Sequence, residues 1–198
     1  MFETRIHGRG GQGVVTSAEL LAVAAFREDR HAQAFPSFGS ERTGAPVVSF
    51  CRIDDHAIRT REPISAPDAV IIVDPTLLHH VDVFGGLKAA GQVLVNSSRS
   101  IDQLGIAELE ETLGAVFCVV PATEIAREQL GRPLPNAALL GAFAALTGVV
   151  SLDSVAGAIH QRFSGDVAEA NVRAARAASQ LVTPSSGTAA PPKEATCA

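Results

Sequence analysis

The sequence predicts an α/β fold built on an open, mainly parallel sheet that is flanked by helices. Phe2 to His7 alternates apolar and polar residues, as a strand does, and runs into a glycine-rich stretch followed by a helical pattern from Val14 to Phe26. Three further apolar runs end at residues that commonly cap helices, which is typical of strands in a parallel sheet. Strands that alternate with helices in this way indicate the α/β class.

The three apolar runs are Ala69 to Val73, Gln92 to Val95 and Ala115 to Val120. Helical spacing of apolar residues predicts helices over Thr76 to Ala90, Ile106 to Leu113, Thr123 to Gln129, Asn136 to Val149, Leu152 to Arg162 and Asp166 to Leu181. Val47 to Ile53 and Ala57 to Glu62 alternate on either side of a short polar turn and predict an antiparallel hairpin. We therefore expect a Rossmann-like sheet that carries an inserted β-hairpin.

Composition places the chain among compact globular proteins. It has 198 residues, of which 46% are hydrophobic and 19% charged. A chain of this length can bury one substantial core, so one domain is expected over residues 1–182. After Leu181 the sequence becomes rich in Pro, Ser and Ala, and residues 183–198 are predicted to form a tail.

Charge and cysteine content exclude several classes of function. The net charge of -5 and a pI near 5.6 argue against binding a nucleic-acid backbone. The longest nearly apolar stretch, Leu139 to Val150, is too short to span a membrane, and the first residues lack the apolar core of a secretory signal. Cys51, Cys118 and Cys197 have no spacing of a metal or iron-sulfur site. We expect a cytoplasmic protein that binds no metal by itself.

Gly8, Gly10 and Gly13 match the pattern G-x-G-x-x-G between a strand and a helix. Such a turn directs backbone N–H groups and a helix N-terminus at an anion such as a pyrophosphate, although it also serves simply to pack a helix close to a sheet. The acidic residue that dinucleotide binding requires is missing from Arg30 to Phe38, and the lysine of a P-loop is replaced by Val14. NAD binding and nucleotide hydrolysis are therefore not expected.

A second segment, Gln33 to Pro46, has neither helical nor strand period and is predicted to be a functional loop. It contains two phenylalanines that can stack on a ring, and Ser, Arg and Thr donors that can bind phosphate or carboxylate. The same residue types anchor protein interfaces, so the sequence leaves both interpretations open.

Asp74 follows a predicted strand, where it caps a helix or faces a ligand crevice. No nucleophile lies in a G-x-S-x-G turn, and the histidines have no partner at catalytic or metal-ligand spacing. We therefore expect no catalytic residue in this chain, which looks like part of a larger catalyst.

Taken together, these motifs resemble the gamma subunit of the pyruvate/2-oxoacid:ferredoxin (acceptor) oxidoreductase family. The resemblance rests on the glycine motif with its helix, Ala34 to Pro46, Arg59 to Ile64, Asp74-Pro75-Thr76, Asn136 to Leu140 and Asn171 to Ala175. It spans nearly the whole chain before the tail.

The resemblance implies a complex that oxidatively decarboxylates a 2-oxoacid such as pyruvate or an aromatic 2-oxoacid and transfers the acyl group to coenzyme A. Alpha, beta and delta-type subunits are the implied partners and hold thiamine diphosphate, magnesium and 4Fe-4S clusters. Ferredoxin or an NAD-reducing flavin subunit accepts the electrons. Such complexes belong to anaerobic metabolism.

In this family the gamma-type domain resembles a lid and assembly element on the coenzyme A side. The expected contacts to coenzyme A or to a partner chain are Gly8, Arg9, Gly10, Gly11, Gln12, Gly13, Ser37, Phe38, Gly39, Ser40, Glu41, Arg42, Thr43, Asp74 and Asn136. Two alternatives remain open at this point: a free-standing dinucleotide-binding oxidoreductase, and a purely structural assembly subunit.

Overall fold

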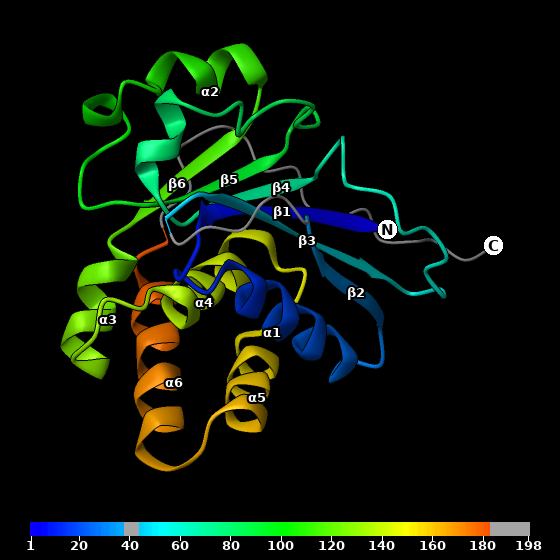
Figure 1. Ribbon diagram of the computed structural model, residues 1–198, viewed down its shortest axis with the longest axis vertical. Helices are drawn as coiled ribbons and strands as arrows, with labels where there is room; N and C mark the ends of the chain where they lie inside the picture. Colours follow the sequence, from blue (N-terminus) through cyan, green and yellow to red (C-terminus); the bar gives the residue numbers. More distant parts are fainter. Residues whose placement is uncertain (38–43, 183–198) are drawn as a thin grey trace.

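The computed structural model describes residues 1–37 and 44–182 of the chain. In these residues six strands form one sheet in the order β2-β3-β1-β4-β5-β6, with helices on both faces (Figure 1). β1, β4, β5 and β6 run parallel to one another, whereas β3 lies antiparallel between β1 and β2. The predicted α/β class with a mainly parallel sheet is confirmed.

The elements have the following bounds. The strands are β1 (Phe2–Arg9), β2 (His31–Pro36), β3 (Pro46–Asp54), β4 (Ala69–Ile72), β5 (Gln92–Asn96) and β6 (Val116–Val120). The α-helices are α1 (Val14–Phe26), α2 (Ala107–Leu113), α3 (Ala122–Leu130), α4 (Asn136–Thr147), α5 (Leu152–Arg162) and α6 (Gly165–Gln180). Two short 3-10 helices are η1 (Pro75–His79) and η2 (Asp102–Leu104).

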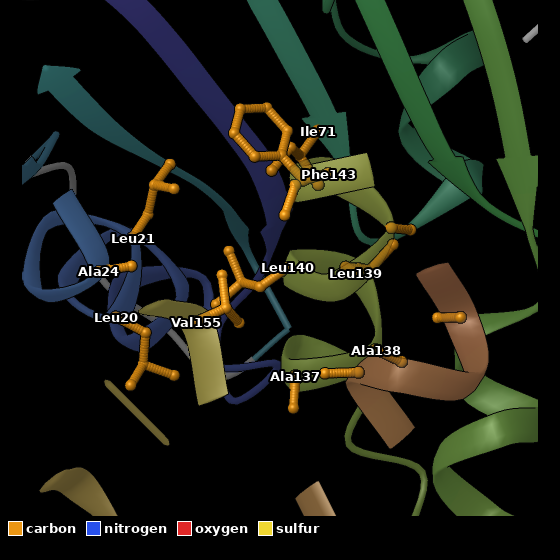
Figure 2. Close-up of a cluster of buried hydrophobic side chains, with 14 of the residues drawn as sticks. Leu20, Leu21, Ala24, Ile71, Ala137, Ala138, Leu139, Leu140, Phe143 and Val155 are labelled. Carbon is orange, nitrogen blue, oxygen red and sulfur yellow. The ribbon is translucent and has the colours of Figure 1, made fainter. Parts of the chain in front are cut away.

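The central strands are apolar throughout because both faces of the sheet are covered. Ile71 of β4 and Leu94 of β5 join the larger core with residues of α1, α4, α5 and α6. Their neighbours Val70 and Val93 point the other way, into a second core with Leu77 of η1. Figure 2 shows the larger core, where Phe143 of α4 lies against Ile71. Figure 1 shows α2 and the larger helical group on opposite sides of the sheet.

The predicted hairpin of Val47 to Ile53 with Ala57 to Glu62 is wrong in one of its strands. The first run is β3, but its antiparallel partners are β1 and the preceding β2, with Phe35 opposite Phe50. Ala57 to Glu62 forms no regular structure. The prediction that Gln33 to Pro46 lacks a strand is also wrong, since residues 33–36 belong to β2. An inserted antiparallel pair does exist, formed by β2 and β3.

The helix predicted over Thr76 to Ala90 is also wrong beyond its first turn. Only the 3-10 helix η1 forms, and the chain then continues without a helix to β5. Gly85 and Gly86 interrupt the pattern, and Gly86 has a φ of 73°, which is left-handed. The other predicted helices are present as α2 to α6, and the bounds of α5 are those predicted.

No helix in residues 1–37 or 44–182 is long and apolar enough to cross a membrane. The tail predicted over 183–198 lies outside the described residues.

Candidate functional site

The turn Gly10–Gly13, called the glycine turn below, joins the end of β1 to α1 at the carboxyl edge of the parallel strands. Gly13 has a φ of 72°, and a β-carbon there would overlap the side chain of Asn136. At Gly8, inside β1, a β-carbon would lie 2.5 Å from Cγ2 of Val14. Two glycines of the motif are therefore required by close packing, whatever the turn binds.

Side chains that surround Asp74 hold the glycine turn in place. Nε of Arg9 donates to Oδ2 of Asp74 at 3.1 Å, and Nε2 of Gln12 donates to the same oxygen at 2.9 Å. Arg9 also donates from Nη1 to the carbonyl of Gly44 at 3.1 Å and from Nη2 to Oγ1 of Thr76 at 2.9 Å. Arg9 and Gln12, which the sequence predicts to contact a ligand or partner, thus donate hydrogen bonds within the site.

Asp74 fulfils the capping role that its position after β4 predicts. Its Oδ1 accepts hydrogen bonds from the backbone N–H of Thr76 at 3.0 Å and from Oγ1 of Thr76 at 2.6 Å. Partial burial raises the pKa of Asp74, but the hydrogen bonds from Thr76 and Gln12 and the charge of Arg9 outweigh this, so the pKa lies below its ordinary value. The carboxylate is therefore ionised, and its negative charge balances the positive charge of Arg9.

The second predicted loop meets the glycine turn. The N–H of Gly10 donates to the carbonyl of Ala45 at 2.9 Å, and the N–H of Gly44 donates to the carbonyl of Gly10 at 3.4 Å. At the other end of the loop, the N–H of Ser37 extends the sheet by donating to Val48 at 2.8 Å. The remaining predicted contacts of this loop, Phe38, Gly39, Ser40, Glu41, Arg42 and Thr43, lie outside the described residues.

Asn136 joins the site from a distant part of the chain. It is the first residue of α4, and its Nδ2 donates to the carbonyl of Gly13 at 2.9 Å. Its Oδ1 is buried and has no hydrogen-bond partner among the described residues. The structure thus brings the glycine turn, Asp74 and Asn136 together, and it leaves one acceptor beside the turn unused.

The N-terminus of α1 faces the same edge. Within the described residues no side chain caps this helix, and its first turn contains no acidic residue. Among residues 1–37 and 44–182, a β-carbon built on Gly11 would meet nothing within 4 Å. A helix N-terminus without a side-chain cap or an acid in its first turn favours an anion.

Sequence reasoning missed three residues that build this edge. Thr76 and Gly44 complete the contacts of Arg9. Asn96, the last residue of β5, donates from Nδ2 to the carbonyl of Val73 and to Oγ1 of Thr123, both at 2.8 Å. Thr76 and Asn96 could have been found from their positions after apolar runs, where parallel strands end at one edge of a sheet. Gly44 lies in the loop before the antiparallel β3, where the sequence gives no such signal.

The described residues do not fit an iron-sulfur cluster or a catalytic metal. No group of three or more His, Cys, Asp or Glu side chains in them is placed to hold a metal ion. Burial raises the pKa of the Cys51 thiol to about 12, so this thiol stays protonated and is no ligand.

The contacts of Asp74 argue against dinucleotide binding. That function needs an acidic residue at the end of a second parallel strand beside the first. Here β1 lies between β4 and the antiparallel β3, and β3 begins at Pro46, opposite Arg9. The parallel neighbour of β1 is β4, and the acidic residue that follows it, Asp74, is already hydrogen-bonded to Arg9, Gln12 and Thr76.

Comparison with known proteins agrees with this description. The chain is 51% identical over 178 residues to the pyruvate/ketoisovalerate oxidoreductases common subunit gamma of Thermococcus kodakarensis, covering 90% of this chain and 95% of the relative. It is 47% identical over 178 residues to the pyruvate synthase subunit PorC of Methanothermobacter marburgensis, covering 90% and 96%.

A solved structure shares the fold. The crystal structure of the pyruvate oxidoreductase subunit PORC of Thermotoga maritima superposes with a TM-score of 0.80 at 36% identity, covering 93% of this chain and 98% of that chain. The model of the pyruvate ferredoxin/flavodoxin oxidoreductase family matches residues 3–181. The resemblance suggested by the sequence motifs is thereby confirmed, and the chain belongs to the pyruvate ferredoxin/flavodoxin oxidoreductase family.

Proposed function

We propose that this chain is the gamma subunit of a multi-subunit 2-oxoacid:acceptor oxidoreductase and that it contacts coenzyme A beside its glycine turn. The complex would convert a 2-oxoacid and coenzyme A into acyl-CoA and carbon dioxide, and pass the electrons to ferredoxin or another acceptor. The subunit assignment is supported by relatives named as gamma or PorC subunits, each covered over at least 95% of its length.

Thiamine diphosphate, magnesium and iron-sulfur clusters are assigned to companion subunits. Within residues 1–37 and 44–182, no group of three or more His, Cys, Asp or Glu side chains is placed to hold a metal ion. The 2-oxoacid would therefore react on the companion subunits, where thiamine diphosphate supplies carbanion stabilisation.

The contact to coenzyme A rests on the N-terminus of α1. No side chain among the described residues caps this helix, and no acid lies in its first turn, so its positive end can attract a phosphate group. Asn136 adds a buried, unused Oδ1 beside the turn that can accept a hydrogen bond. Arg9 and Asp74 hold this arrangement rigid, which favours binding because less freedom is lost.

A purely structural role is the second candidate. It is favoured by one observation, namely that Arg9 and Gln12 donate hydrogen bonds to Asp74, Thr76 and Gly44 within the chain. The coenzyme A contact and the structural role differ in one expectation, namely whether a charge at the start of α1 changes the KM for coenzyme A.

The test places a charge in the first turn of α1. Val15→Glu adds an acid where the helix dipole tolerates it, so folding is preserved while the phosphate of coenzyme A is repelled. In the purified complex we expect the KM for coenzyme A to rise roughly threefold to tenfold with kcat nearly unchanged.

Val15→Gln is the matched control, because it has nearly the same size and no charge, and its KM should stay near that of the native chain. Equal KM values for the Glu and Gln variants would favour the structural role and contradict the coenzyme A contact.

A further inference from the structure

An apolar groove lies next to the glycine turn, on the helical side of the sheet. It has a volume of about 550 Å³ and is formed by α1, α3, α4, α6 and the connections between them. Its lining includes Leu20, Leu130, Leu134, Phe163, Val167 and Ala170. Leu20 and Ala137, both buried and labelled in Figure 2, contribute from α1 and α4. We call this feature the α1–α6 groove.

Two large apolar side chains of this groove are left in solvent. Val167 is 57% exposed and Leu134 is 42% exposed, and few large apolar side chains of the described residues are as open. Exposed apolar side chains gathered around a groove are typical of protein interaction sites, because burying them against a partner removes apolar area from water.

The charges around the groove favour an acidic partner. Arg132 and Arg173 both line it, and among the described residues no carboxylate forms an ion pair with either of them. Arg173 donates a hydrogen bond from Nε to Oε1 of Gln129 at 3.3 Å. Asp166, an acidic residue that also lines the groove, lies in the first turn of α6, where its negative charge interacts favourably with the positive end of the helix dipole. The groove therefore offers two arginines to an incoming carboxylate.

Asn136 connects the groove to the glycine turn. The same side chain lines the groove and donates to the carbonyl of Gly13 at 2.9 Å. A segment bound in the groove would consequently lie beside the N-terminus of α1.

From these contacts we propose that the α1–α6 groove binds a segment of a companion subunit that presents a large apolar side chain flanked by a carboxylate. The apolar side chain would pack between Leu134 and Val167, and the carboxylate would pair with Arg132 or Arg173. The inference rests on the proposed function, which supplies a companion subunit, and adds the surface by which it docks.

The experiment measures assembly of the full-length tagged chain with its companion subunits. Val167→Glu puts a charge on the apolar surface of the groove, and Arg173→Glu reverses a charge on it. We expect each to raise the dissociation constant for the companion subunits about tenfold or more, as for central interface residues. Phe26→Glu is the matched control, since Phe26 is 56% exposed and is not among the groove residues. Thermal unfolding of each isolated variant checks that it folds.

The outcomes separate the two proposals. If the native chain fails to assemble with the companion subunits, the proposed function itself is wrong. If it assembles and folded Val167→Glu and Arg173→Glu bind as tightly as the native chain, or no more weakly than Phe26→Glu, the groove is not the docking surface. If the isolated chain is a dimer that Val167→Glu dissociates, the occupant is a second copy and the inference is overturned.

Discussion

His7 makes the stability of this chain sensitive to mild acid. The side chain lies on β1, is only 4% exposed, and has no hydrogen-bond partner for either ring nitrogen among the described residues. Burial, and then the nearby Arg5 guanidinium, lower the pKa of His7 from 6.5 to about 4, whereas Asp82 acts in the opposite direction. The folded chain therefore keeps this imidazole neutral under conditions in which the unfolded chain protonates it.

The sign and size of the effect follow from proton linkage. Above the unfolded pKa of 6.5 both states hold a neutral imidazole, so the full stability is present. As the pH falls from 6.5 towards 4, the unfolded state binds a proton that the folded state does not, and stability is lost. Between pH 7 and pH 4.5 the loss from His7 is about 2 kcal/mol, which lowers the melting temperature by roughly 5 °C.

The assay compares urea unfolding of the native chain and of His7→Leu at pH 7 and pH 4.5. Because neither ring nitrogen is hydrogen-bonded, leucine gives up no bond, and the variant should be nearly as stable as the native chain at pH 7. At pH 4.5 it should be more stable by about 2 kcal/mol. His79→Gln, which replaces an exposed histidine, is the matched control. If the free energy of unfolding falls by the same amount in the native chain and in His7→Leu between the two pH values, the reasoning is refuted.

Two further predictions concern glycines that permit close packing. Gly141→Ala should destabilise the chain by about 2 kcal/mol or more, because the added β-carbon would overlap the backbone carbonyl of Ala175 where α4 packs on α6. Thermal unfolding measures the loss of stability, and an unchanged melting temperature would contradict the packing argument. Gly13→Ala should cost about 2 kcal/mol through the left-handed φ of 72° and the overlap with Asn136. Adding Asn136→Ala should restore part of this loss by removing the overlap, and a double variant less stable than Gly13→Ala alone would count against that explanation.

The local elements of the fold could be predicted because they depend on neighbouring residues. Helix α5 has the predicted bounds, and Ser151 caps it by accepting a hydrogen bond from the N–H of Ser154 at 3.1 Å. Asp74 likewise caps the 3-10 helix η1, as its position after an apolar run predicts. The continuous apolar runs of β4, β5 and β6 identified strands that are covered on both faces.

Strand partnership could not be predicted in the same way. The sequence predicts that Val47 to Ile53 is a strand and that Ala57 to Glu62 pairs with it, whereas the structure pairs this strand with the earlier β2 and β1. β2 ends at Pro36 and carries only partly buried residues after its first position, so its sequence gives a weak strand signal. Pairing across a sheet depends on tertiary packing more than on local preference.

The candidate site, too, was predicted from the sequence only in part. From the sequence alone came the glycine turn, the capping Asp74 and the family, because these depend on residue type and spacing along the chain. Tertiary structure alone decided that Arg9 is engaged by Asp74, Thr76 and Gly44, and that Asn136 reaches Gly13 across 123 residues. The physical reason is that hydrogen bonds and packing are set by distances in space, which a periodic pattern along one strand or helix does not contain.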